Sequence, residues 1–141
     1  MRLGFKINQP LPSRQLADPL SGVPERGNNM KLNKISQEEA KKFERPGLSG
    51  QIYFPSEFKK GFNAMLITAN GKHPRKKMID TIRVYFIIEG EGIFSIDDKK
   101  YEIKSEELFV IEPGQEYEYD AKAKMFEFNV SPGNSFRDLK L

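Results

Sequence analysis

Apolar and polar residues alternate over short segments from about residue 51 to residue 130. "QIYF" at 51–54 and "GFNAMLITA" at 61–69 read as strands, as do "YEIK" at 101–104 and "ELFVI" at 107–111. In "YEIK" the alternation turns Tyr101 and Ile103 inward. "EYEYD" at 116–120 and "KMFEFNV" at 124–130 end the series. Asp97–Lys100 and Pro113-Gly114 supply turns between strands. Many short strands separated by turns predict an all-β sandwich or barrel.

One segment departs from the alternation. "RVYFIIE" at 83–89 is apolar at consecutive positions. A strand that is buried on both of its faces has this pattern. Gly90 and Gly92 then bracket a bend into "IFSI". We therefore expect residues 83–89 to be buried on both sides within a closed or stacked sheet.

Two segments before this core carry other signals. "SQEE" places Glu39 three residues after Ser36, which is a capping box, and it predicts a short N-terminal helix that ends at Arg45-Pro46-Gly47. "GKHPRKK" at 71–77 contains Gly71 and Pro74 and reads as a basic loop between strands. This loop could bind an anion or a phosphate backbone, although a solvated loop is the favoured interpretation because no aromatic residues interleave with the charges.

Residues 1–29 differ from the rest of the chain. They are rich in Pro, Gly, Ser and Asn and have no sustained periodicity, which is typical of a disordered arm. A second interpretation is that Met30 is the native start and that residues 1–29 are a non-native upstream extension. Both interpretations stay open. Residues 30–141 are then expected to form a single domain.

Composition excludes several classes of function. Of the formal net charge of +3, residues 1–29 carry +2, so the basic balance does not argue for nucleic acid. No apolar segment is long enough to cross a bilayer. The chain has no cysteine, which fits a reducing cytoplasm. We expect a cytoplasmic protein with neither a nucleic-acid nor a membrane partner.

The stretch "VYFIIEGEGIFSIDDKKYEIKSEELFVIEPGQEYEY" at 84–119 resembles the core of the cupin superfamily. The most specific elements are the apolar strand ending in "EGEG", the "IDDKKYEI" hairpin, and the apolar strand leading into "PG". The resemblance covers residues 62–130. It implies a cupin-type double-stranded β-helix, which is a jelly-roll barrel that is open at one end.

Metal-binding cupins carry two histidines one residue apart, then a glutamate, and later a third histidine. The resemblance places the first two slots at Lys76 and Met78, or at Lys77 and Ile79. The glutamate slot is Arg83 and the last histidine slot is Tyr117. None of these residues matches the pattern, and a transition metal needs three or four converging donors. We therefore expect no metal and no other cofactor.

The same resemblance points Arg83 and Tyr85 into the barrel and brings Tyr117 from the opposite wall. Arg83 would bind a carboxylate or a phosphate, and the tyrosines would contact a sugar or an aromatic compound. The alternative is that Arg83 pairs with a glutamate such as Glu127 and the tyrosines fill the core. His73 would be either a general base at the barrel rim or, as favoured here, an exposed loop residue.

Three functions follow from this picture. The first is a non-metal cupin that binds a small anionic or sugar-like molecule in the barrel. The second is a metal-independent enzyme of the isomerase or epimerase type acting on a sugar or sugar nucleotide, against which stands the lack of a histidine in the expected core strands. The third is an interaction module without a pocket. We also expect a homodimer formed through the open edge of "QIYF".

Overall fold

The computed structural model describes residues 33–132 and 136–141, and in these residues the chain is nearly all β. The elements are β1 (Lys41–Arg45), β2 (Leu48–Phe54), the 3-10 turn η3 (Ser56–Phe58), β3 (Phe62–Met78), β4 (Ile82–Ile96), β5 (Lys99–Glu102), β6 (Leu108–Ile111), β7 (Glu116–Val130) and β8 (Asp138–Lys140). The all-β prediction is confirmed. The predictions for residues 1–29 fall outside the described residues. In the described ranges no helix has the length and apolar character needed to cross a membrane.

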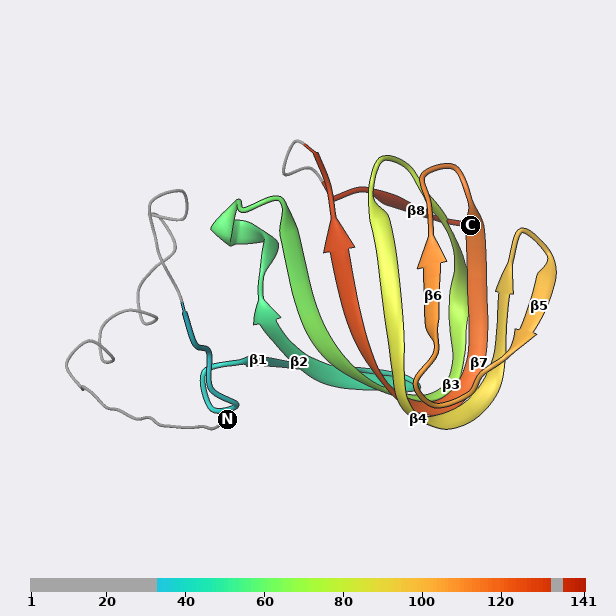
Figure 1. The fold of residues 1–141 in the computed structure, drawn as a ribbon, viewed down its shortest axis with the longest axis horizontal. Coiled ribbons are helices and arrows are strands. Elements are labelled where there is room, and N and C mark those ends of the chain that lie inside the picture. The colour runs from blue at the N-terminus through green and yellow to red at the C-terminus, as the bar shows by residue number, and fades with distance from the viewer. Residues whose placement is uncertain (1–32, 133–135) are drawn as a thin grey trace.

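Three long strands determine the architecture. β3, β4 and β7 have 17, 15 and 15 residues, and the sheet order is β1-β2-β3-β7-β4-β5, with β6 paired to β4 and β8 paired to β3. All of the pairings are antiparallel. Each long strand bends near its middle, so that its two halves lie in two facing layers (Figure 1). The interior therefore lies between two halves of the same strands.

Small residues permit the bend. Gly90 and Gly92 of β4 have φ values of 121° and 145° and pair with Ala123 and Ala121 of β7. A Cβ atom on either glycine would collide with the β7 backbone at those alanines. Because only glycine adopts such φ values without strain, the "GEG" motif fixes where β4 turns from one layer into the other. The bend predicted at this point is present.

The core fills the space between the layers. Its buried side chains come mainly from the long strands and include Ile67, Met78, Tyr85, Ile87, Phe94, Ile111, Tyr117 and Met125. The hairpin predicted at Asp97–Lys100 is present, because Asp97 and Asp98 have φ values of 49° and 67° between β4 and β5. Ile103 is buried as expected, whereas Tyr101 is 37% exposed.

The predicted N-terminal helix is wrong. The capping box does form, since the Ser36 amide donates to Glu39 Oε1 at 2.8 Å and the Glu39 amide donates to Ser36 Oγ at 3.2 Å. These bonds close one turn, after which Lys41–Arg45 pairs with β2 as β1. Pairing with a neighbouring strand outweighs the local helix signal because tertiary hydrogen bonds and packing of Phe43 against the core are available.

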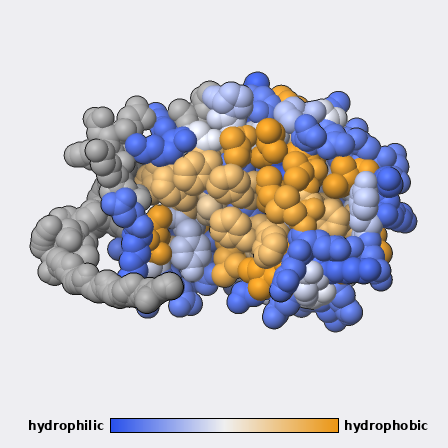
Figure 2. Space-filling model, in the orientation of Figure 1, coloured by the Kyte–Doolittle hydropathy of each residue, from blue (hydrophilic) through white to orange (hydrophobic). Residues whose placement is uncertain are grey.

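The expectation that residues 83–89 are buried on both faces is also wrong for this chain. Tyr85 and Ile87 are fully buried, but Phe86 on the opposite face is 38% exposed. Together with neighbouring side chains it forms an outer apolar patch, visible as orange atoms in Figure 2. The patch comprises Ile82, Phe86, Leu108, Val110 and Phe126, whose exposed fractions lie between 37% and 55%.

"QIYF" does not form an open edge over its whole length. It belongs to β2, which pairs with β3 on one side and with β1 on the other, through Ile52. On this side the sheet therefore ends at β1. The edge on which the homodimer was predicted is covered by β1 at Gln51 and Ile52, whereas Tyr53 and Phe54 have no partner in β1.

Candidate functional site at the mouth of the barrel

His73 lies inside the barrel, in contrast to the exposed loop that was favoured. β3 continues through Gly71, and its pairing with β7 shifts register between His73 and Lys76, where Pro74 falls. Proline, which has no backbone N–H, is tolerated in strands at such a bulge. His73 pairs with Tyr119 of β7, and their rings stack with centroids 4.6 Å apart. The expectation that the core strands lack a histidine is therefore wrong.

A cavity of about 430 Å³ opens beside His73. This volume is within the range of small-molecule sites. The cavity is bounded by the β1–β2 turn, by β3, by β7 and by β8; its lining residues are Arg45, Pro46, Gly47, Leu48, Lys72, His73, Pro74, Lys76, Tyr119 and Lys140. The lining contains four cationic side chains and no carboxylate. Its electrostatic potential therefore favours an anion.

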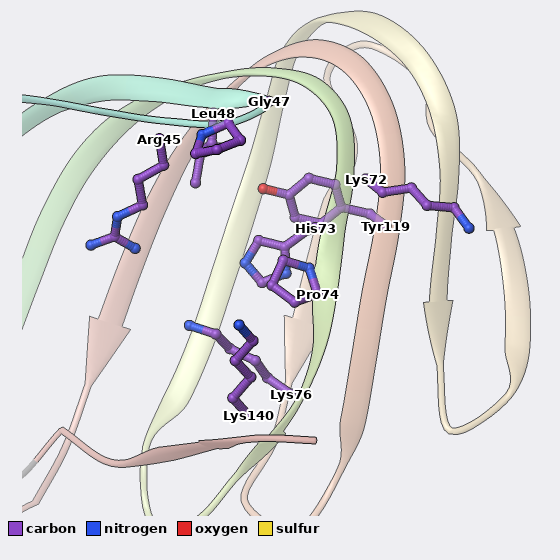
Figure 3. A pocket seen from close by; sticks show the side chains of 10 residues that line it. Arg45, Gly47, Leu48, Lys72, His73, Pro74, Lys76, Tyr119 and Lys140 are labelled. Atoms are coloured by element: carbon purple, nitrogen blue, oxygen red, sulfur yellow. The ribbon is translucent and has the colours of Figure 1, made fainter.

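Figure 3 shows how the cations are arranged. Lys76 and Lys140 come from paired positions of β3 and β8, and their side chains extend into the same space below His73. Arg45 extends from the β1–β2 hairpin on another side, and Lys72 extends away from the group. Within the described residues, Arg45 and Lys140 have no ion-pair partner. Two fixed charges are thus available to a ligand without breaking an existing pair.

Two buried polar atoms at this cavity have no hydrogen-bond partner among the described residues: Nδ1 of His73 and the hydroxyl of Tyr119. Tyr119 is only 3% exposed, and its oxygen points into the cavity region in Figure 3. A buried polar group without a partner is costly, on the order of 1–3 kcal/mol. These atoms are therefore placed to receive a partner that is not part of the described chain.

Burial sets the ionisation of both groups. Desolvation, assisted by the nearby charge of Lys76, lowers the pKa of His73 to about 4. Desolvation also raises the pKa of Tyr119 above its ordinary value. At neutral pH the cavity therefore presents a neutral imidazole and a neutral phenol, each of which can donate or accept a hydrogen bond.

Arg83 lies at the centre of a polar network beneath the cavity. Its Nη1 donates to the Tyr117 hydroxyl at 2.7 Å and lies 3.1 Å from Oδ2 of Asp138. Its Nε donates to Oδ1 of Asn129 at 2.6 Å and lies 3.3 Å from Oε2 of Glu127. Burial alone would lower the pKa of Arg83, but the Glu127 carboxylate and the oxygens of Tyr85 and Tyr117 together outweigh it, and the pKa is raised well above the ordinary value.

The two tyrosines of the predicted site meet in the same network. The hydroxyls of Tyr85 and Tyr117 are 3.1 Å apart, and both side chains are fully buried. Burial raises the pKa of Tyr117 to about 12 and raises that of Tyr85 as well. His73 stacks on Tyr117 with ring centroids 5.4 Å apart. The structure thus brings the four predicted site residues, His73, Arg83, Tyr85 and Tyr117, into one connected cluster, of which His73 lines the cavity.

Arg83 has the partner that the alternative interpretation named, since it pairs with Glu127. A direct contact between Arg83 and a ligand stays a prediction, and Asp138 occupies one side of the guanidinium group. Sequence reasoning missed Tyr119 and Asp138. The alternation in "EYEYD" places Tyr119 on the same face as Tyr117 and could have found it. No local signal indicates that Asp138 returns to the barrel.

The residues at the cupin metal slots do not fit a metal. The slots of the glutamate and of the last histidine hold Arg83 and Tyr117, which hydrogen-bond to each other at 2.7 Å. A guanidinium group cannot act as a ligand, and its charge repels a cation. Across the described ranges, no three His, Asp or Glu side chains converge in a group that could hold an ion.

Comparison with known proteins agrees with this geometry. Residues 67–136 match the family of the AraC-like ligand binding domain. The chain belongs to the cupin superfamily. This places a cupin-type ligand-binding domain in the part of the chain that forms the barrel. Among curated protein sequences, none matches this cupin.

Solved structures share the fold at low sequence identity. A Streptomyces Pac13 variant with uridine has a TM-score of 0.65 and 14% identity, over 79% of this chain and 93% of that chain. Pac13 is described as a nucleoside dehydratase. KdgF from a Halomonas species has a TM-score of 0.60 and 9% identity, over 72% of this chain and 96% of that chain. Ectoine synthase from P. lautus has a TM-score of 0.60 and 14% identity, over 73% and 79%. These likenesses show the fold.

Proposed function

We propose that this cupin binds a small anionic or sugar-like molecule in the mouth of its barrel without a metal ion. The observation that carries the proposal is the cavity lining, which contains no carboxylate and in which Arg45 and Lys140 have no ion-pair partner among the described residues. Lys76 lies beside them, with its Nζ 3.4 Å from Oδ2 of Asp138. His73 and Tyr119 add neutral hydrogen-bonding groups and ring faces. Arg83, Tyr85 and Tyr117 lie beneath them and hold the cavity floor in place.

The proposal is tested by the effect of one exposed cation. A thermal-shift screen of anionic and neutral sugar-like compounds compares wild type with Lys140→Gln, which removes a charge of the cavity. Lys122→Gln is the matched control, because Lys122 is an exposed residue of β7 outside the cavity lining. We expect anions to raise the Tm of wild type and of the control, and to bind Lys140→Gln roughly three- to tenfold more weakly, since a nearby charge contributes about 1 kcal/mol at the surface.

Two results would overturn the proposal. One is that no compound in the screen shifts the Tm of wild type. The other is that Lys140→Gln and Lys122→Gln lose affinity equally, which would indicate a general effect of net charge and not a site.

A metal-independent enzyme acting on a sugar or sugar nucleotide is the second candidate. The objection to it was the lack of a histidine in the core strands, and the position of His73 in β3 removes that objection. Pac13, described as a nucleoside dehydratase, is a structural neighbour. Incubation of each bound compound with the protein, followed by proton NMR, separates the two: a binder returns the compound unchanged. The cavity itself argues against an interaction module without a pocket.

We further propose a homodimer formed through the outer apolar patch and not through "QIYF". Exposed apolar surface of this kind, concentrated on adjacent strands, is typical of an interface. The side chains of the patch carry no charge, so a second copy related by a two-fold axis can cover them without a charge mismatch.

The absence of cysteine fits the reducing cytoplasm, where we expect the protein to work.

A further inference from the structure

Two features of the cavity differ in kind. The cations at its rim attract an anion regardless of what else the anion carries. The Tyr119 hydroxyl and His73 Nδ1 attract no charge, yet they are buried, lack partners among the described residues, and lie on paired positions of β7 and β3. A simple anion held at the rim would leave them unsatisfied.

We infer that the cavity selects an anion that also carries hydroxyl groups, and that Tyr119 and His73 recognise the hydroxyl. The inference rests on the proposed function and adds the substrate class to it. The class is a hydroxylated oxyanion, whose charged group is either a carboxylate or a phosphate. A hydroxyl group both donates and accepts, so it can satisfy the Tyr119 oxygen and the His73 nitrogen, whichever of them donates.

A purely structural role for Tyr119 predicts a different effect of removing its hydroxyl group. If Tyr119 only filled the core, its ring would be needed and its hydroxyl would not. The ring does pack in the core: its centroid lies 5.2 Å from that of Phe94 and 5.8 Å from that of Tyr85. Tyr119→Phe keeps these ring contacts and removes only the oxygen. The variant therefore separates recognition from packing.

The experiment measures affinities by titration calorimetry for two pairs of probes. Glucose 6-phosphate is compared with inorganic phosphate, and gluconate is compared with hexanoate, so that each pair differs in hydroxyl groups while keeping the type of charged group. The proteins are wild type, Tyr119→Phe and the control Tyr101→Phe. Tyr101 is 37% exposed on β5 and does not line the cavity. His73→Phe, which keeps a ring at position 73, is a second test of the same prediction.

We expect wild type and Tyr101→Phe to prefer the hydroxylated member of at least one pair. In Tyr119→Phe this preference falls roughly three- to tenfold, the loss of one neutral hydrogen bond, while affinity for the plain anion is unchanged. The Tm of ligand-free Tyr119→Phe equals or exceeds that of wild type, because the lost hydroxyl has no partner in the described chain. A preference in the phosphate pair alone identifies a phosphate ligand, and one in the other pair alone a carboxylate.

The contrary results are distinct. If anions bind but the hydroxyl groups bring no preference, or if Tyr119→Phe keeps the wild-type preference, this inference is wrong and the proposed function stands. If none of the four probes binds wild type, this inference is wrong, and the broader screen of the previous section decides whether the proposed function fails with it.

Discussion

The two halves of β7 place opposite kinds of residue on the outside of the barrel. In the first half, Glu116, Glu118 and Asp120 alternate with the buried Tyr117 and Tyr119. Arg75 of β3 pairs with two of these acids, Glu116 at 2.8 Å and Glu118 at 3.5 Å. This half has the ordinary polarity of a strand on a protein surface.

The second half reverses that polarity. Glu127 and Asn129 point inward and are 6% and 1% exposed, whereas Phe126 points outward and is 37% exposed. The inward acid is held by Arg83, and Asn129 Nδ2 donates to Glu127 Oε2 at 2.8 Å. The difference teaches that alternation identifies a strand without saying which face is the core. A half-strand with reversed polarity indicates a polar network inside the barrel and an exposed apolar surface outside it, to which another chain can bind.

The interior of the reversed half gives the largest expected effect. Arg83→Met leaves the Glu127 carboxylate buried without its cation, and we expect a loss of about 3–5 kcal/mol in the free energy of unfolding, measured by urea denaturation. Arg83→Met combined with Glu127→Leu removes both charges and should recover most of that loss. A loss below about 1 kcal/mol in the single variant would show that the Arg83–Glu127 contact does not hold the reversed half.

The interior of the first half gives a pH effect. The pKa of His73 in the folded state is about 4, below the ordinary 6.5, because of desolvation and Lys76, with Arg83 acting in the same direction and Glu127 opposing. The cavity cations Arg45 and Lys140 also face it. The unfolded chain then binds the proton more readily, so the stability contributed by neutral His73 is fully present above pH 6.5. It is lost as the pH falls toward 4, by about 3 kcal/mol.

This pH effect is measured by urea denaturation at pH 7 and at pH 4.5 in wild type and in His73→Phe. The variant keeps every other titrating group, so the pH dependence that comes from the carboxylates is the same in both proteins. We expect the variant to lose less stability between the two pH values than wild type does. Equal losses would mean that His73 is not held neutral by the barrel.

The outside of the reversed half gives the smallest effect on folding and a measurable effect on assembly. Phe126→Glu places a charge in the outer apolar patch, and we expect it to weaken self-association by roughly 30-fold or more, the effect of about 2 kcal/mol at the centre of an interface. Tyr101→Glu is the matched control, because Tyr101 is also 37% exposed and lies outside the patch. Sedimentation velocity measures both. A wild-type protein that is monomeric at high concentration would contradict the proposed homodimer.

Much of the barrel was predictable because turns and bends depend on local chemistry. The Asp97-Asp98 turn, the "GEG" bend and the Pro113-Gly114 turn are each required by the backbone at that point. The second half of β3 was not predictable in this way, because "KHPRKK" has no apolar alternation and becomes a strand by pairing with β7 and β8. The N-terminal helix failed for the related reason that β2 offered β1 a partner that outweighs the local capping signal.

The candidate site was predictable in part. The resemblance to cupins brought Arg83, Tyr85 and Tyr117 together, and they do touch. It could not place His73, whose strand was read as a loop. It also could not place Asp138, since β8 lies far along the chain and returns to pair with β3 at Lys76–Met78. Contacts between distant segments depend on tertiary pairing that the local sequence does not encode.

The three bent strands have a consequence for how the molecule comes apart. Because β3, β4 and β7 each contribute to both layers, the two layers share their three central strands. Breaking the hydrogen bonds of one layer therefore disrupts strands whose other halves are still hydrogen-bonded in the second layer. Loss of order at the mouth is therefore coupled to loss of order at the closed end, and the barrel should unfold as one cooperative unit in which a ligand at the mouth protects amides throughout the long strands.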